Sequence, residues 1–275
     1  MDLTGILEIA GRTDAGKIRE QNEDSIGEEV ELGTIILADG MGGYHGGEVA
    51  SAIAVNTILN HLHEHVSTLR PGQIDKKTGL SKESLHVRMA ISQANTTIVK
   101  ASETQPQYRG MGTTVVMGVF HHSKITIAHV GDSRMYRFRD NLLEQLTVDH
   151  TLLQELVDRG FYTEQEARDS LNKNLVTRAL GIASEVTVDI KELEAQPGDI
   201  YLLCSDGLND MISDEVIHST ISTYSTNLQE AADNLIQVAN NNGGRDNVSV
   251  VLAKPLLPFP APSIPWYKKL LNFTF

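Results

Sequence analysis

The sequence has a single cysteine, Cys204, among its 275 residues. One cysteine excludes an intramolecular disulfide framework, and its place in the apolar run YLLCSD indicates an inert, buried thiol in a reducing compartment. Long apolar runs are missing too. No window reaches the length of a membrane-spanning helix, and the first residues, MDLTGILEIAG, lack the basic region of a signal peptide. We therefore expect a cytoplasmic protein.

Basic residues are in the minority, with 23 Lys and Arg against 36 Asp and Glu and a formal net charge of −13. Nucleic-acid backbones are bound through clustered Lys and Arg, and no such cluster appears, so a general nucleic-acid binder is excluded. Acidic chains that bind phosphorylated partners usually recruit metal ions to do so. The hydrophobic content of 40% predicts a globular protein with a substantial core.

The stretch TIILADGMGGYHGGEVA, residues 34–50, combines an apolar run with a carboxylate and glycines. The apolar residues 35–38 predict a buried strand that ends at Asp39, and five glycines follow within eight residues. Glycine lacks Cβ and permits positive φ, so carbonyl oxygens and the carboxylate can turn toward one cation or phosphate. Taken alone, the stretch also fits an ordinary glycine-rich turn before a helix.

Hydrophobic spacing predicts alternating groups of helices and strands. The expected strands are 3–11, a four-strand antiparallel meander of 113–120, 124–130, 135–139 and 141–146, then 187–195, 199–204 and one after 246. The expected helices are 50–66 and 87–98 as an antiparallel pair on one sheet face, 151–160 and 163–170 in an inserted subdomain, 213–223, and one after the capping-box pair Asn227 and Glu230.

Three further features have an ordinary structural interpretation. The loop KIREQNEDS, with Arg19 and Glu23, resembles charge-mixed solvated surface. Asp132 lies in a Gly-Asp-Ser turn between two strands, where aspartate usually accepts backbone hydrogen bonds. His61 and His65 share one helix face and could bind zinc, but no third ligand follows at a recognisable spacing, so a hydrophilic helix end is favoured.

Three acids stand beside glycine or at the edge of apolar runs: Asp39, Asp206 and Asp246. Carboxylates that converge at strand ends repel one another, so their convergence requires compensating divalent cations. Ligation by oxygen alone, without His or Cys, favours Mg²⁺ or Mn²⁺ over zinc or copper. The ordered set therefore predicts a metal site.

Eight runs carry a resemblance to a known family: REQNEDS (19–25), ADGMGG (38–43), GMGTTV (110–115), VGDSR (130–134), LTVDH (146–150), VTRALG (176–181), CSDG (204–207) and GRDNV (244–248). In this order they resemble the motifs of the metal-dependent type-2C (PPM) protein Ser/Thr phosphatases, and the compact bacterial members most. The match extends from about the first strand to Ala253.

The resemblance implies an α/β (α+β) fold of four layers, α-β-β-α, in which two packed antiparallel sheets are flanked by helix pairs. A binuclear metal site would lie at one edge between the sheets. The phosphatase domain would span 1–254 with a flap at about 151–190, and residues 255–275 would form a proline-rich tail. The tail is expected to be an extended strap on the domain, or a membrane-surface or partner contact.

The resemblance also implies roles at the metal site. Asp39 would bridge both ions, Asp206 and Asp246 would complete the first, and the Gly40 carbonyl would reach the second. Glu23 would join the second ion through water, with Asp24 in support. Two Mn²⁺ or Mg²⁺ ions would lower the pKa of the bridging water, and the resulting hydroxide would attack phosphorus in line.

Other residues take roles around this centre. Arg19 would clamp the substrate phosphate, and Asp132 would hold a weaker third metal together with the acid that is Asp206 here. Met41 replaces the histidine that eukaryotic relatives carry directly after the first Asp-Gly. The leaving-group proton must then come from elsewhere. His45 and His150 are candidates, and a metal-bound water is the simpler donor.

The predicted function is hydrolysis of phosphoSer and phosphoThr on protein substrates of a Ser/Thr kinase, by a monomer that binds no nucleic acid. A catalytically inactive type-2C-like binding or sensor module is an alternative, but such proteins lose metal acids and this chain keeps them. A partner-switch phosphatase shares the chemistry. Those relatives usually carry sensor domains, for which this chain has no room.

Overall fold

The computed structural model describes residues 2–43, 45–66, 69, 73–163, 166 and 175–259. The strands are β1 Leu7–Asp14, β2 Asp24–Glu29, β3 Thr34–Met41, β4 Gly112–Thr113, β5 Val115–His121, β6 Lys124–Val130, β7 Arg134–Arg139, β8 Leu142–Gln145, β9 Asp189–Glu194, β10 Ile200–Cys204 and β11 Val248–Pro255. The helices are α1 Gly46–His65, α2 Lys82–Thr104, the 3₁₀ turn η2 Pro106–Tyr108, α3 Leu152–Asp158, α5 Asp206–Asn209, α6 Asp214–Thr223 and α7 Leu228–Asn241.

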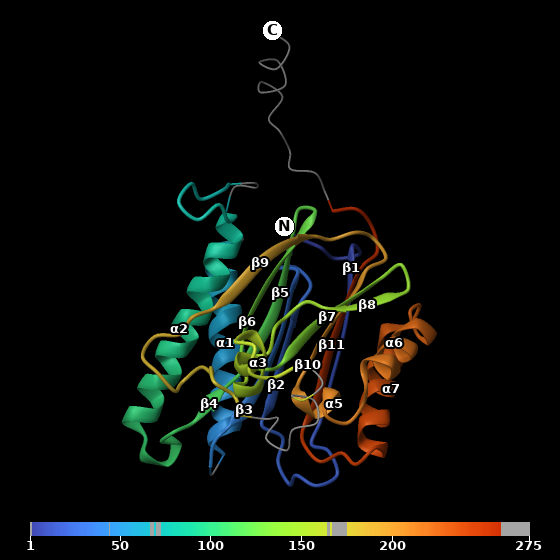
Figure 1. Ribbon diagram of the computed structural model, residues 1–275. Coiled ribbons are helices and arrows are strands. Elements are labelled where there is room, and N and C mark those ends of the chain that lie inside the picture. The colour runs from blue at the N-terminus through green and yellow to red at the C-terminus, as the bar shows by residue number, and fades with distance from the viewer. Residues whose placement is uncertain are drawn as a thin grey trace.

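Two antiparallel sheets form the centre of the molecule. One has the strand order β1-β11-β10-β7-β8, and the other has the order β2-β3-β5-β6-β9 with β4 paired to β3. Helices α1 and α2 cover the β3 sheet, and α6 and α7 cover the β10 sheet (Figure 1). The predicted four-layer sandwich with a helix pair on each outer face is confirmed.

Three apolar clusters separate these layers, which explains why several strands read as continuous apolar runs. Ile36 and Ile58 belong to the cluster between the β3 sheet and its helices. Tyr201 and Leu203 pack between the two sheets, whereas Leu202 on the same strand packs toward α6 and α7. Both faces of β10 are therefore buried, so its sequence shows no polar alternation.

Local signals in the sequence set the ends of the long helices. The Asn227 side chain accepts a hydrogen bond from the backbone N–H of Glu230, which confirms the predicted cap of α7. The predicted burial of Cys204 is confirmed, and burial raises the pKa of its thiol to about 12. None of the described helices is long and apolar enough to cross a membrane.

The predicted four-strand meander is wrong. Strands β5 and β6 pair in one sheet, whereas β7 and β8 pair in the other, next to β10. The link at Gly131, Asp132 and Ser133 therefore crosses between sheets, and Gly131 has a φ of +111° that favours glycine. Successive β-branched runs show where strands lie, but packing of the two sheets decides which strands pair.

Two predicted boundaries shift. The last strand runs through Pro255, which pairs with Leu7, and the backbone N–H of Leu256 donates to the Ile6 carbonyl at 2.7 Å. The aromatic ring of Phe259 packs against the inter-sheet core, so the predicted domain limit at 254 is too early. Strand β9 begins at Asp189, inside the predicted flap. Most of the predicted helix 163–170 and the tail beyond 259 lie outside the described residues.

Candidate metal and phosphate site

Asp39 lies near the end of β3, where two threonines fix its backbone. The Asp39 carbonyl accepts from Thr113 Oγ1 and from the Thr114 backbone N–H, both at 2.9 Å. The Asp39 backbone N–H donates to Thr114 Oγ1 at 3.1 Å, and this hydroxyl lies 2.7 Å from Ser133 Oγ. The GMGTTV and VGDSR motifs therefore hold the first acid in place.

Asp206 and Asp246 lie next to the ends of two neighbouring strands. Strand β10 ends at Cys204, and Asp206 is the first residue of the short helix α5. Asp246 stands two residues before β11, which pairs with β10. A Cβ on Gly207 would lie 2.0 Å from the Asn247 carbonyl oxygen, so only glycine lets these two segments approach this closely.

The electrostatics of Asp39 show that several carboxylates converge. Burial raises the pKa of Asp39 well above its usual value, and the charges of Asp24, Asp206, Asp132 and Asp246 raise it further. The pKa of Asp206 is raised by burial first, and then by Asp132 and Asp246. A concentration of negative charge that is partly withdrawn from water is an arrangement that divalent cations stabilise.

Asp24 faces Asp39 across the β2–β3 pair. Its Oδ2 accepts from Ser205 Oγ at 2.9 Å and from Ser249 Oγ at 2.6 Å. Its Oδ1 is buried and has no hydrogen-bond partner among the described residues. Burial raises the pKa of this carboxyl to about 6. A buried oxygen without a donor, beside Asp39, fits a site that receives a cation or its water.

Gly40 and Glu23 meet where β3 leads into α1. The Gly40 backbone N–H donates to the Glu23 carbonyl at 3.1 Å. A Cβ on Gly40 would lie 2.2 Å from the Gly47 carbonyl oxygen, so a side chain would fill this cradle. Burial raises the pKa of the Glu23 carboxyl, and a hydrogen bond from the Gly47 backbone N–H lowers it. Glu23 therefore lies against the first turn of α1.

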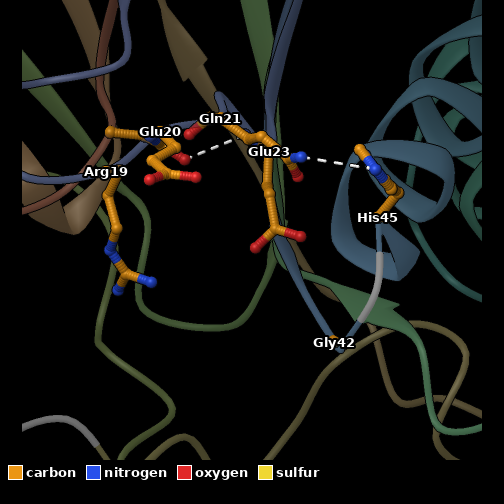
Figure 2. Close-up of a pocket in the computed structure, with 7 residues that line it drawn as sticks. Arg19, Glu20, Gln21, Glu23, Gly42 and His45 are labelled. Atoms are coloured by element: carbon orange, nitrogen blue, oxygen red, sulfur yellow. Dashed lines mark hydrogen bonds between the residues drawn. The ribbon is translucent and has the colours of Figure 1, made fainter.

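Arg19 extends from the same loop as Glu23. Figure 2 shows both side chains pointing in the same direction from this loop. Arg19 Nη2 donates to Asp246 Oδ2 at 2.8 Å, and this hydrogen bond raises the pKa of the guanidinium. A cavity of about 520 Å³ opens here; it is lined by Arg19, Glu20, Gln21, Glu23, Gly42, His45 and Asn247. The solvated-surface interpretation of the loop is therefore incomplete, because the loop forms one wall of this cavity.

Asn247 holds this loop, a role that sequence reasoning missed. Its Nδ2 donates to the carbonyls of Ala15 at 3.0 Å and Gln21 at 2.8 Å, and its Oδ1 accepts from the Glu23 N–H at 2.8 Å. Asn247 stands inside the GRDNV motif, directly after a predicted metal acid. That position was the available signal, but partners more than 220 residues away are invisible to local patterns.

Asp132 is only 7% exposed, which an ordinary surface turn would not require. Burial raises the pKa of its carboxyl to about 6, and Asp149 adds to the effect. Asp132 also raises the pKa values of Asp39 and Asp206, so its charge faces the same centre.

The two histidine candidates for general acid lie in different surroundings. His45 lines the cavity, and its Nε2 lies 3.3 Å from Gln21 Nε2 (Figure 2). His150 is 5% exposed, its Nδ1 accepts from the Gly131 N–H at 3.0 Å, and its Nε2 lies 3.3 Å from Asp189 Oδ2. His150 is thus tied into the structure and does not line this cavity.

The donor chemistry fits Mn²⁺ or Mg²⁺, because the convergent groups are carboxylates and backbone carbonyls. Among the described side chains, those that bring three ligand atoms within 4.8 Å of one another all include histidine. The ligand atoms of Asp39, Asp206 and Asp246 are therefore not all within 4.8 Å of one another in this structure.

The four-layer fold and its carboxylate cluster define a metal-dependent phosphoprotein phosphatase. The family model described as protein phosphatase 2C matches residues 17–242. The chain belongs to the protein phosphatase 2C family.

Similar proteins agree with this assignment. The chain is 38% identical over 246 residues to the serine/threonine phosphatase stp of Listeria monocytogenes serotype 4b, covering 88% of this chain and 94% of stp. It is 39% identical over 251 residues to the serine/threonine protein phosphatase PstP of Mycobacterium tuberculosis, covering 91% of this chain but 45% of PstP.

Solved structures match as well. The crystal structure of the M. tuberculosis phosphatase PstP/Ppp has a TM-score of 0.80 at 38% identity and covers 90% of this chain and 98% of that chain. The PstP catalytic domain in complex with 2 manganese ions has a TM-score of 0.76 at 37% identity, with the same coverage.

Proposed function

We propose that this phosphatase hydrolyses phosphoSer and phosphoThr on proteins, at the site between the Arg19 loop and the acids Asp39, Asp206 and Asp246. The observation that carries the proposal is the electrostatic coupling of these acids, one of which, Asp246, accepts a hydrogen bond from Arg19 on the wall of the 520 Å³ cavity. The substrate class follows from the family and from the serine/threonine phosphatases that the chain resembles. The proteins of a Ser/Thr kinase pathway are the proposed substrates, and the enzyme acts as a monomer.

The residues of this chain divide the task between them. Asp39, Asp206 and Asp246 would hold two Mn²⁺ or Mg²⁺ ions, with the Gly40 carbonyl and Glu23 on the side of the second. When bound, these ions supply Lewis-acid chemistry that neutralises phosphate charge and activates the attacking water. Asn247 keeps the loop of Glu23 in register, as its three hydrogen bonds require.

Arg19 binds the phosphate in this proposal. Its guanidinium already donates one hydrogen bond to a carboxylate oxygen, Asp246 Oδ2, and two oxygens of a phosphate can accept hydrogen bonds from the same planar guanidinium as a bidentate pair. The side chain is about half exposed, so it can exchange one partner for the other. It would orient phosphorus for in-line attack rather than form a covalent bond.

Proton delivery to the leaving group is assigned to solvent at the site rather than to a histidine. Met41 offers no proton at the position after Gly40. His150 does not line the cavity, and its Nδ1 already accepts a backbone hydrogen bond. His45 lines the cavity, but it is half exposed at the N-cap of α1, and its Nε2 faces the Gln21 side chain.

Asp132 would bind a weaker third ion together with Asp206. Its burial and its charge contribution at Asp206 support this assignment. We expect Asp132→Ala to keep the fold but lower kcat on phosphopeptides and shift the Mn²⁺ dependence. Superimposable Mn²⁺ curves with unchanged kcat for the wild type and the variant would return Asp132 to a structural turn residue.

A phosphopeptide panel with phosphoSer, phosphoThr and phosphoTyr, assayed with Mn²⁺ and with EDTA, tests the function. Arg19→Ala should lower kcat/KM about 10- to 100-fold, because a hydrogen bond to a charged group contributes about 1.5–3 kcal/mol. Lys17→Ala removes a cation from the same loop and should leave kcat/KM unchanged. Equal losses in both variants, or full activity in EDTA, would contradict the proposal.

A further inference from the structure

Three histidines from two helices meet at the end of α1 that lies away from the acids. His61 and His65 stand one turn apart near the end of α1, and His86 lies in the second turn of α2. Because the two helices pack side by side and run in opposite directions, the end of α1 meets the beginning of α2 (Figure 1). One ring nitrogen from each histidine lies within 4.8 Å of the other two.

The sequence showed two of these residues but not the third. His61 and His65 form an i, i+4 pair, whereas His86 is brought in by helix packing across a connector. The sequence places no third ligand at a recognisable spacing, and it therefore predicts a plain hydrophilic helix end. In the structure His86 is the third histidine beside this pair.

Hydrogen bonds set the tautomers of the two rings on α1. His61 Nδ1 lies 2.8 Å from the amide oxygen of Gln93, and His65 Nδ1 lies 2.9 Å from the His61 carbonyl oxygen. An oxygen acceptor requires a protonated Nδ1, so in the neutral His61 ring the lone pair is on Nε2, the nitrogen that faces His86. Donation from one ring nitrogen to a carbonyl oxygen is how metal-ligating histidines are oriented in proteins.

The spacing between ligand atoms suits a small divalent cation. His61 Nε2 lies 3.3 Å from His86 Nδ1. Two nitrogens bound to one tetrahedral zinc at about 2.0–2.1 Å are roughly 3.3–3.4 Å apart. The three ring centroids are 4.3, 5.3 and 5.6 Å apart, and the His65 ring is stacked on the rings of both His61 and His86, so the three side chains form one compact group.

One of the three histidines is buried and the other two are partly exposed. His61 is 6% exposed and fixed by Gln93, whereas His65 and His86 are partly exposed, so an ion can enter from solvent. Along α1 the histidines are about 20–27 Å from Gly47 at the acid site, at 1.5 Å per residue. The two sites are therefore separate.

We propose that His61, His65 and His86 form a binding site for a divalent transition-metal ion of the zinc class, with water completing the coordination. Imidazole nitrogens favour this class over Mg²⁺ and Mn²⁺, which the all-oxygen site favours. When the ion binds, the His86 proton moves from Nδ1 to Nε2 as the ring changes tautomer, so no net proton release is required. The bound ion would fasten the end of α1 to the beginning of α2.

Zn²⁺ titration calorimetry on the EDTA-treated full chain, in excess Mg²⁺, tests this site. The wild type should bind one Zn²⁺ equivalent more than His86→Gln or His65→Gln, or bind it at least 10-fold more tightly. His63→Ala is the matched control, because His63 is a half-exposed histidine on the same helix turn and pairs with Glu29. It should bind Zn²⁺ as the wild type does.

Gln93→Ala supplies a second, independent variant. It keeps all three ligands and removes the group that orients His61, so Zn²⁺ affinity should fall about 10- to 100-fold. Circular dichroism of each variant establishes that it is folded. Zn²⁺ stoichiometry and affinity in folded His86→Gln equal to those of His63→Ala would overturn the proposal, whatever the phosphatase activity. Co²⁺ added to the wild type should give a visible absorption band that His86→Gln lacks.

Discussion

Replacing Asn247 with alanine should lower both the stability and the activity of this phosphatase. The side chain is 6% exposed and makes three hydrogen bonds of 2.8, 2.8 and 3.0 Å to the backbone at Glu23, Gln21 and Ala15. At about 1 kcal/mol for each hydrogen bond, the free energy of unfolding should fall by about 2–4 kcal/mol. That is a large part of the roughly 5–15 kcal/mol that stabilises a typical domain.

The activity should fall for a different reason. The same loop carries Arg19 and Glu23, and a misplacement of about 1 Å in such groups can cost about 100-fold in rate. We therefore expect kcat/KM of Asn247→Ala on a phosphopeptide to drop by roughly that factor at saturating Mn²⁺. Activity is measured without urea and well below the Tm, where the variant is folded, so that a lower kcat/KM does not reflect unfolding.

Urea unfolding and Mn²⁺-dependent phosphopeptide hydrolysis are the two assays, with Asn242→Ala as the control. Asn242 is exposed and its side chain donates one hydrogen bond, to the Met211 carbonyl, so Asn242→Ala should change the free energy of unfolding by no more than about 0.5 kcal/mol and leave kcat/KM unchanged. If Asn247→Ala matches that control in both assays, Asn247 does not hold the loop of Arg19 and Glu23 in the position that activity requires.

Three further predictions concern other parts of the chain. Neither His45→Ala nor His150→Ala should remove the ~10²- to 10⁴-fold in kcat that general acid catalysis supplies, and a loss of that size on a substrate with a poor leaving group would identify the acid. Burial raises the pKa of Asp132 to about 6, so in EDTA the folded protein keeps this proton at a pH where the unfolded chain has already lost it. The resulting contribution to the free energy of unfolding is present near pH 4 and is lost as pH rises through 6. Asp132→Asn should therefore raise Tm at pH 7 but not near pH 4, and equal Tm values at pH 7 would contradict this. Truncation after Phe259 should leave Tm unchanged and activity on p-nitrophenyl phosphate within a few-fold. Truncation after Lys254 should lower Tm, because it removes the Phe259 ring that stacks on Phe120 and the pairing of Pro255 with Leu7 at the end of β11. Equal Tm values for the two truncations would show that this segment adds nothing to the core.

The acids of the site could be predicted because each one stands at the edge of an apolar run. Asp39, Asp206 and Asp246 follow or precede strands whose apolar residues mark them clearly, and neighbouring glycines mark a close approach of the backbone. The motif resemblance then supplied the order in which these strands meet. Local pattern and family motif together were sufficient for the layers and the helix pairs.

The features that could not be predicted depend on distant contacts. Asn247 acts on residues more than 220 positions earlier in the chain, and His86 reaches His61 only because α1 and α2 pack in opposite directions. The strands on either side of Asp132 are predicted as one meander because both are short runs of β-branched or alternating residues separated by a tight turn. Their pairing is set by which sheet buries each apolar face, which local spacing does not encode.

The direct test of the account is Mn²⁺-dependent hydrolysis of a phosphoThr peptide by the wild type and by Asp39→Asn. We expect EDTA to abolish wild-type activity and Mn²⁺ to restore it, while Asp39→Asn is inactive at every Mn²⁺ concentration. In EDTA at pH 7 the variant should also be more stable than the wild type, because burial and the neighbouring acids penalise the charge on Asp39. Activity of the wild type in excess EDTA, or substantial turnover by a folded Asp39→Asn, would contradict it.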